Sequence, residues 1–472
     1  MQASLYKTLT AIGLYVSVAF MTAPTAAAKQ VQLDVALAHP TMLIEDKGKC
    51  ENHLRIALTG FDLPNEKKRM PVNVAIVIDK SGSMQGDKIE HARRAAVQAI
   101  DRLTDNDIVS VVVYDTNVQV IVPATKASDR KEIKERIESI QANGNTALFA
   151  GVSKGAAEVR KFLDDKRVNR VILLSDGLAN VGPSSPSELG QLGASLLKEG
   201  ISVSTMGLGL GYNEDLMSKL ALASSGNHTF IEDAENLVAV FQREFDDVLS
   251  VVAQKIQVHV KLAEGVRPVK VMNYPAEING QTVSIELGQL YSKQERYFVL
   301  EVELPMGKNK EASDVADVKV EYKNMFTETT DKLSSSVQVK YTDSKELVEK
   351  DINKTVLASC VIQIANERNR LATECRDRGD VKGAELLLKD NVRILNDNYD
   401  RYKLPELKER ADANGMQAMQ LGEGDWNRGR KSMRAYQNND SQQQSYSGSG
   451  AKNGYGGNGS TPGTATPPGD KK

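Results

Sequence analysis

The sequence has little histidine and little cysteine, since its 472 residues include 5 histidines and 3 cysteines. The histidines are scattered along the chain and no His-Glu-x-x-His motif is present, so a zinc protease is not expected. The charge also lacks a dominant sign. A net charge of -2 at pH 7 gives no overall attraction to nucleic acid or to acidic membranes. A partner must therefore be recognised by a local site.

The few cysteines offer little covalent support. Cys360 and Cys375 both fall in a helical pattern, in which the rise per residue would hold them ~22 Å apart, too far for a disulfide. Cys50 could pair with one of them in an oxidising compartment, but three cysteines leave one over. The sequence therefore predicts no particular disulfide.

Beyond its first residues, the sequence lacks an apolar run long enough to span a membrane. Residues 1–28 resemble an export signal, with Lys7 ahead of an apolar stretch from about Leu9 to Met21 and small residues at 26–28 for cleavage. A membrane anchor is the alternative, although Thr and Gly interrupt a short run. We expect an exported protein of the periplasm, cell surface or extracellular space, without a transmembrane segment after signal removal.

Two stretches alternate apolar and polar residues with period two, which predicts strands in residues 29–70 and 253–342. The first stretch has two such strands and the second has five, so together they reach about seven, the number of a small β-sandwich. Two lone strands cannot form a domain, so we expect the early pair to join the later strands.

Between these stretches, residues 71–252 alternate strands with helices, which predicts a doubly wound, three-layer α/β domain. The link 115–117 between the expected strands 108–114 and 118–122 is too short for anything but an antiparallel hairpin. The sheet should therefore be parallel with one reversed edge strand. In this interpretation the α/β domain is inserted into the sandwich.

The rest of the chain is expected to be helical and then disordered. Residues 343–435 have a helical pattern with breaks at Gly379 and Leu404–Pro405, and the segment after Gly379 could fold back as a helical hairpin. Residues 436–472 are rich in Ser, Gln, Asn and Gly with almost no aliphatics, a composition typical of a disordered tail.

Oxygen-bearing side chains gather at one edge of the expected α/β sheet. They are Asp79, Ser81, Ser83, Thr146 and Asp176. Ligands of such sheets bind beyond the carboxyl ends of the strands, and the buried run Val74–Ile78 ends at this edge. An oxygen-only set without His or Cys suits Mg²⁺, with Mn²⁺ or Ca²⁺ also possible.

These motifs, Asp-x-Ser-x-Ser at 79–83, Gly-Asn-Thr at 144–146 and Ser-Asp-Gly at 175–177, resemble the von Willebrand factor A domain with its metal-ion-dependent adhesion site. The resemblance covers about residues 71–252 and implies a Rossmann-like domain. The flanking strands and helices resemble, more loosely, bacterial secreted proteins related to inter-α-trypsin inhibitor heavy chains and to chloride-channel accessory proteins.

The resemblance also implies roles for the site residues. Ser81, Ser83 and Thr146 would hold the metal through their hydroxyls, while Asp79 and Asp176 would act directly or through water. Neutral hydroxyls leave the cation electron-poor, so its open position should take an Asp or Glu carboxylate from a partner protein. The function expected is non-enzymatic, cation-dependent protein binding or adhesion, with no role for nucleic acid.

The same residues also allow interpretations without a ligand-binding role. Asp-x-Ser-x-Ser alone could cap the following helix. Asp115 also ends a strand at this edge, but an Asp in a hairpin is more often a turn residue, and it is left out of the site. The main rival function is a structural scaffold of an envelope or surface assembly with a purely structural metal.

Three enzymatic interpretations fit these residues less well than a binding site does. Ser81 is not flanked by the glycines of a Gly-x-Ser-x-Gly elbow. A Mg²⁺-dependent phosphohydrolase of the haloacid dehalogenase type would use Asp79 as nucleophile, but Ser81 replaces its second acid. The segment Gly207–Gly211 could suggest a dinucleotide loop, yet Tyr212 takes the place of the third glycine. No catalytic residue is therefore predicted.

Overall fold

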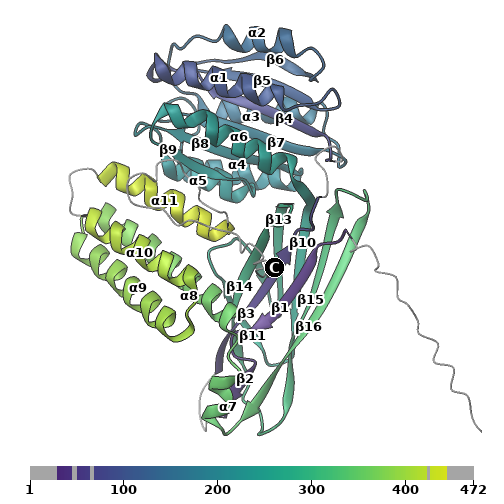
Figure 1. The fold of residues 1–472 in the computed structure, drawn as a ribbon, viewed down its shortest axis with the longest axis vertical. Coiled ribbons are helices and arrows are strands. Elements are labelled where there is room, and N and C mark those ends of the chain that lie inside the picture. The colour runs from purple at the N-terminus through teal and green to yellow at the C-terminus, as the bar shows by residue number, and fades with distance from the viewer. Residues whose placement is uncertain (1–28, 45–49, 64–68, 422–425, 444–472) are drawn as a thin grey trace, which may run out of the picture.

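The computed structural model describes residues 29–44, 50–63, 69–421 and 426–443. The predicted export signal and most of the predicted tail lie outside these residues. Figure 1 shows an α/β domain above a two-sheet β-sandwich, with a bundle of helices beside both. The predicted fold class is confirmed.

The α/β domain has one six-stranded sheet of order β6-β5-β4-β7-β8-β9. Its strands are β4 (Val72–Asp79), β5 (Ile108–Tyr114), β6 (Val118–Lys126), β7 (Val168–Ser175), β8 (Ile201–Leu208) and β9 (His228–Ile231). Its helices are α1 (Asp87–Asp101), α2 (Arg130–Glu138), α3 (Leu148–Arg160), α4 (Pro186–Lys198), α5 (Glu214–Ala223) and α6 (Leu237–Leu249). All neighbouring strands are parallel except β5 and β6, so the reversed edge strand is confirmed.

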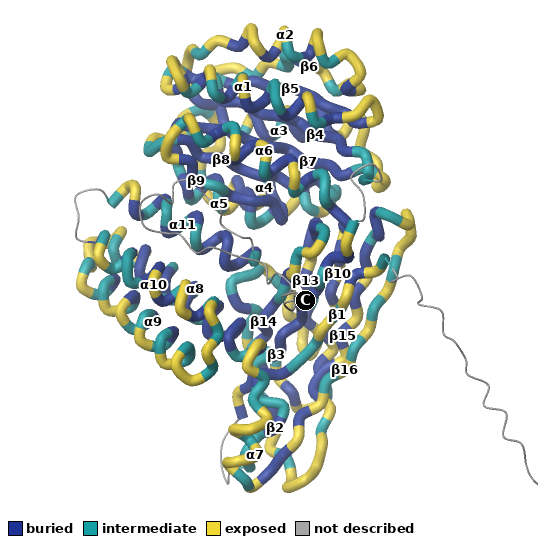
Figure 2. The backbone as a smooth tube through the Cα atoms, in the orientation of Figure 1, coloured by how far each residue is buried: buried dark blue, intermediate teal, exposed yellow. Residues whose placement is uncertain are grey.

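The central strand β4 shows why this sheet needs helices on both faces. Every residue of β4 is buried, and successive side chains point to opposite sides. Val74 and Ile76 pack with α1 and α6, whereas Ala75 and Val77 pack with α3. The burial pattern in Figure 2 follows this arrangement, with a buried sheet between two helical layers.

The sandwich is built from strands on both sides of the α/β domain. One sheet contains β1 (Gln32–Leu37), β3 (Cys50–Thr59), β14 (Glu295–Leu304) and β11 (Arg267–Val271). The other contains β12 (Glu277–Asn279), β13 (Thr282–Tyr291), β10 (Val251–Leu262), β15 (Ala312–Asn324), β16 (Thr330–Thr342) and β2 (Thr41–Leu43). Because β3 pairs along its whole length with β14, the segments before and after the α/β domain share one sheet. The α/β domain is thus an insertion into the sandwich.

The predicted strand number was too low, since the two sheets have four and six strands. The strands missed are β2, β11 and β12. They have three to five residues each, and their side chains do not alternate between buried and exposed. Runs that short carry too little periodicity to be recognised. In addition, β10 begins at Val251, so the sandwich starts two residues before the boundary predicted from the sequence.

Five helices complete the described chain. They are α7 (Lys345–Lys350), α8 (Lys354–Asp377), α9 (Val381–Tyr402), α10 (Pro405–Gln420) and α11 (Trp426–Gln442). The break between α8 and α9 is at Gly379, whose φ of 87° suits glycine and ends the first helix. Pro405 begins α10, as the predicted break at this point implies.

The predicted tail is wrong for its first residues, because α11 continues through residue 442. The side chains of this last part of α11 are polar but buried. Gln437 Nε2, for example, donates to Asn369 Oδ1 and to Thr373 Oγ1 of α8, both at 2.8 Å. Amide hydrogen bonds with α8 therefore hold a segment that lacks the aliphatic side chains of an ordinary helix face.

Two further expectations can be compared with the structure. No pair among Cys50, Cys360 and Cys375 forms a disulfide. Within the described ranges, none of the helices combines the length and the apolar character needed to cross a bilayer.

Candidate metal centre

The five predicted site residues are contributed by three loops at the carboxyl edge of the α/β sheet. Asp79 is the last residue of β4, and Asp176 directly follows the neighbouring parallel strand β7. The backbone N–H of Gly82 donates to the carbonyl of Gly144 at 2.9 Å, which ties the loop of the two serines to the loop of Thr146. Segments far apart in the sequence thus meet at one point of the fold.

A chain of short polar contacts joins the serines to Asp176. Ser81 Oγ and Ser83 Oγ lie 3.1 Å apart, and Ser83 Oγ donates to Asp176 Oδ1 at 2.6 Å. Ser81 and Asp176 are buried, whereas Ser83 is exposed. The cluster therefore opens to solvent at Ser83.

Asp79 lies behind the serines and is held by two donors. Its Oδ1 accepts the backbone N–H of Ser81 at 2.8 Å, and its Oδ2 accepts the hydroxyl of Ser175 at 2.7 Å. Burial raises the pKa of Asp79 to about 6, although these hydrogen bonds from Ser81 and Ser175 favour the charged form. The side chain is thus fixed in orientation and enclosed by protein.

Thr146 completes the set from the loop that precedes α3. Its backbone N–H donates to Asn180 Oδ1 at 2.9 Å, and its carbonyl accepts the N–H of Asn180 at 3.2 Å. A Cβ added at Gly177 would lie 2.8 Å from Thr146 Oγ1 and 3.5 Å from Ser83 Oγ. Glycine at this position therefore leaves open the space between the two hydroxyls.

Three contributors to the cluster were not singled out from the sequence: Ser175, Gly177 and Lys88. Ser175 and Gly177 belong to the motif around Asp176, but their contacts depend on the neighbouring loops. Lys88, on α1, forms an ion pair with Asp176 Oδ2. No spacing in the sequence could reveal this pair, because it depends on where α1 crosses the sheet edge.

Asp115 plays the turn role expected for it. Its Oδ1 accepts the backbone N–H of Asn117 at 2.7 Å, and its Oδ2 pairs with Lys80. Hydrogen bonding and the Lys80 charge hold the pKa of Asp115 below its usual range, although burial opposes them. One carboxylate oxygen is therefore engaged within the hairpin, and the other is engaged by the residue that follows Asp79.

The donor set fits a hard divalent cation. The side chains that meet at this edge offer hydroxyl and carboxylate oxygens, which are the ligands of Mg²⁺, Mn²⁺ and Ca²⁺. Among the described residues there is no group of three or more His, Cys, Asp or Glu side chains placed to bind a metal. This agrees with a site that has only two carboxylates and depends on Ser and Thr for its remaining oxygens.

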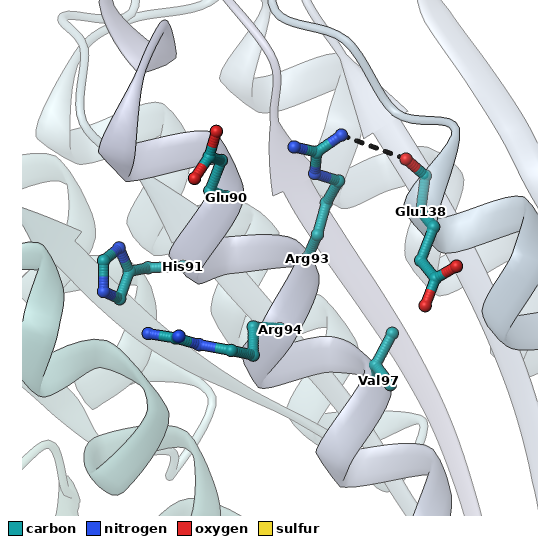
Figure 3. A pocket seen from close by; sticks show the side chains of 6 residues that line it. All are labelled: Glu90, His91, Arg93, Arg94, Val97 and Glu138. Carbon is teal, nitrogen blue, oxygen red and sulfur yellow. Dashed lines mark hydrogen bonds between the residues drawn. The ribbon is translucent and has the colours of Figure 1, made fainter.

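A shallow depression elsewhere on the α/β domain lacks such convergence. It is lined by Glu90, His91, Arg93, Arg94, Val97 and Glu138 (Figure 3). Arg93 donates to the backbone carbonyl of Glu138 at 3.0 Å, as the dashed line shows. The lining side chains come from α1 and from Glu138 at the end of α2, and they include both charges and an apolar residue, so they define no ligand type.

Comparison with known proteins identifies the α/β domain. Residues 73–244 match the family model of the von Willebrand factor type A domain. The chain is 28% identical over 264 residues to a Synechocystis protein described as uncharacterized protein sll0103, covering 54% of this chain and 62% of that protein. It is 27% identical over 207 residues to mouse inter-α-trypsin inhibitor heavy chain H3, covering 42% of this chain and 23% of that protein. The chain thus spans less than two thirds of either relative.

Solved structures resemble a larger part of the fold. A von Willebrand factor type A protein from Catenulispora acidiphila superposes with a TM-score of 0.66 at 18% identity, covering 82% of this chain and 91% of that one. The ArnB paralog VWA2 from Sulfolobus acidocaldarius superposes with a TM-score of 0.61 at 16% identity, covering 88% and 98%. Since these coverages exceed the α/β domain alone, the likeness extends to its surroundings, at the level of fold.

Proposed function

Because residues 73–244 form a von Willebrand factor type A domain, we propose that this chain binds a partner protein through a divalent cation at the carboxyl edge of the domain's sheet. Mg²⁺ is the cation that we favour, with Mn²⁺ or Ca²⁺ as alternatives. A bound cation would supply a positive charge with a position open to an Asp or Glu carboxylate of the partner.

The observation that carries this proposal is the hydroxyl-rich cluster open to solvent at Ser83. Ser81, Ser83 and Thr146 would hold the cation through hydroxyl oxygens. Asp79 and Asp176 would orient those hydroxyls and balance the charge, directly or through water. With neutral oxygens nearest the cation, much of its charge remains available to an incoming carboxylate.

A non-enzymatic role is part of the same proposal. For Asp79 to attack a phosphate ester, one of its oxygens would have to be accessible and free to form a bond. Asp79 is 0% exposed, and both of its oxygens accept hydrogen bonds. This engagement supports binding over phosphoryl transfer.

We further propose that the protein acts outside the cytoplasm, in the periplasm, at the cell surface or in the extracellular space. The support is the signal-like segment 1–28, which lies outside the described residues. The sandwich and the helices would then present the metal edge to partners in that compartment.

The test is partner capture by the full mature chain from an envelope or surface extract, with Mg²⁺ and after complete chelation. We expect bound protein to be released by chelator and restored by Mg²⁺. Ser83→Ala should lose this capture, because it removes an accessible hydroxyl ligand. Ser184→Ala, at an exposed serine of the β7–α4 loop that follows Asp176, is the matched control and should retain it.

The outcomes separate the rival functions. Capture that survives chelation and Ser83→Ala would overturn the proposal in favour of a scaffold with a structural metal. A phosphorylated Asp79 formed from a generic phosphate ester would overturn the non-enzymatic part.

A further inference from the structure

Three parts of the molecule meet at the C-terminal end of α11, far from the metal edge. Gln442 Nε2 donates to the carbonyl of Gly226, between α5 and β9, at 2.7 Å. Gln442 Oε1 accepts Arg296 Nη1 of β14 at 3.4 Å, and Gln443 Oε1 accepts the N–H of Tyr297 at 3.1 Å. Figure 1 shows this end of α11 directed toward the sandwich, beneath the α/β domain.

Arg296 is the charged group at this junction. It is 2% exposed, and its Nε and Nη2 make no hydrogen bond with any described residue. Its neighbours are neutral: the Gln442 amide at 3.4 Å and Tyr274, whose ring centroid lies 5.9 Å from the guanidinium and whose hydroxyl also interacts with it. Burial lowers the pKa of Arg296, and Tyr274 and Tyr291 oppose this effect. Arginine nevertheless stays protonated in proteins, so a full positive charge is buried here.

The unpaired Nε and Nη2 form the edge of the guanidinium that binds a carboxylate through two parallel hydrogen bonds. Other arginines of this molecule use that edge in this way. Arg160 donates from Nε and Nη2 to the two oxygens of Glu199, at 2.6 and 2.8 Å, and Arg267 does so to Glu303. Both of those pairs are at the surface, where water would lower the cost of leaving the edge free. Arg296 is buried and has the greatest need of a partner.

Arg170, another fully buried arginine, shows how the charge of a buried guanidinium is usually neutralised. Arg170 is 0% exposed and pairs with the carboxylate of Glu244 at 3.0 Å. No described Asp or Glu does the same for Arg296. In addition, Asn438, one helical turn before Gln442, is 3% exposed with its Nδ2 unpaired. A surplus of donors and an uncompensated charge favour a negatively charged acceptor.

We propose that the Nε and Nη2 edge of Arg296 binds a small anion, either a halide or a compact oxyanion, at the junction of β14, α11 and the α5–β9 segment. The anion neutralises the guanidinium, for which no described Asp or Glu supplies a countercharge. Because Arg296 and Gln442 are both buried, the site admits a compact ion and not a side chain of a partner protein. This proposal does not depend on the metal centre.

The main experiment replaces gluconate, an anion too bulky for a buried site, by chloride, bromide or acetate at constant ionic strength. The full chain should show a saturable rise in its melting temperature with the anion that fits, since binding to the native state alone stabilises it. Chloride and bromide acting alone would identify a halide site, and acetate acting alone would identify an oxyanion site.

Two variants separate this site from general salt effects. Arg296→Met removes the charge, and its melting temperature should no longer depend on which anion is present. Arg267→Met removes an exposed arginine that pairs with the same strand, β14, and should retain the dependence of the wild type. Equal anion dependence in the wild type and in Arg296→Met would overturn the proposal.

A direct measurement covers the case in which Arg296→Met does not fold. Crystals of the unaltered chain grown in bromide should give an anomalous peak against Nε and Nη2 of Arg296. The overturning result has two parts: density at this position without an anomalous signal in bromide, and a melting temperature that does not depend on acetate. Such density would be water, and the proposal would be wrong.

Discussion

Strand β7 has a polar cluster at each end, and the protein neutralises one of them far more fully than the other. At the amino end, Arg170 donates to Ser204 Oγ at 2.6 Å, Glu244 Oε1 at 3.0 Å, Gln289 Oε1 at 2.5 Å and the Tyr291 hydroxyl at 2.8 Å. Two of these partners belong to the sandwich. This end is enclosed by protein and shared between two domains.

At the carboxyl end, the cluster opens to solvent at Ser83. Asp176 has one ion-pair partner, Lys88, and its other oxygen accepts a neutral hydroxyl from Ser83. The comparison teaches that burial alone does not distinguish a structural cluster from a binding site, since Arg170 and Asp176 are 0% and 1% exposed. What differs is whether the protein itself supplies the compensating charge and closes the cluster.

Arg170→Met should have the largest effect, because it breaks the closed cluster. It leaves Glu244 buried without its cation, which costs about 3–5 kcal/mol for a buried pair. Urea unfolding should show this loss as a lower midpoint. Arg160→Met, which breaks the exposed pair with Glu199, is the matched control and should cost about 0–1 kcal/mol. Equal losses in the two variants would show that the amino-end cluster is not a stabilising pair.

Asp247→Asn should sharpen the same comparison through pH. Asp247 lies beside Asn227 at the edge of the closed cluster, and burial, with the charge of Glu244, raises its pKa to about 7. The folded protein therefore holds a proton that the unfolded chain loses near its ordinary pKa of 3.8. The resulting stability is present below pH ~4 and is lost as the pH rises toward about 7.

The variant should remove this slope. Asp247→Asn is expected to equal the wild type near pH 4 and to exceed it in stability above pH 7, where the wild type carries a buried charge. The measurement is the melting temperature from pH 4 to pH 8. An unchanged slope would mean that another group titrates in this range.

Asp79→Asn tests the open cluster. It keeps the shape of a fully buried side chain and its contact with Ser81 N, whereas alanine would strand the donors of Ser81 and Ser175. We expect Mg²⁺ affinity, measured by calorimetric titration, to fall at least tenfold, or about 1.4 kcal/mol, with stability in chelator nearly unchanged. Asp115→Asn is the control for a carboxylate lost near the edge but outside the set. A titration of Asp79→Asn that matches the wild type would contradict the metal centre.

Lys88→Met should have the smallest effect and the opposite sign. Its ammonium occupies Asp176 Oδ2 and repels a neighbouring cation, so its loss should tighten Mg²⁺ binding by roughly threefold, a fraction of the 1.4 kcal/mol that corresponds to tenfold. Lys80→Met, which leaves Asp115 unpaired instead, should bind Mg²⁺ as the wild type does. Weaker binding by Lys88→Met would show that the lysine positions Asp176 more than it competes.

The positions of Asp79 and Asp176 at the sheet edge could be predicted from the sequence because they follow from local patterns. Asp79 and Asp176 each end a buried strand, and parallel strands end at the same edge. The roles of Lys88 and Arg170 could not be predicted, since their partners are contributed by segments far away in the chain. Their pairing depends on helix placement and domain contact, which a local pattern does not encode.

The same reasoning explains the error at the start of the tail. A polar composition predicts disorder because it offers too little apolar surface to offset the entropy of ordering. In α11 the compensation comes instead from hydrogen bonds, such as those of Gln437 with Asn369 and Thr373. Those acceptors are on α8, so they cannot be predicted from the composition of α11.

The inserted topology has a mechanical consequence. The chain leaves the α/β domain between α6 and β10, on the side of Arg170, whereas the metal edge lies at the opposite ends of the same strands. A tension applied by a partner at the metal edge would therefore pass lengthwise through β4 and β7 to the sandwich. When hydrogen-bonded parallel strands are loaded along their length, all the hydrogen bonds between them must break together. The domain would therefore resist a lengthwise pull better than a pull that separates the strands one hydrogen bond at a time. The direction in which a partner pulls would thus decide how long the domain survives the pull.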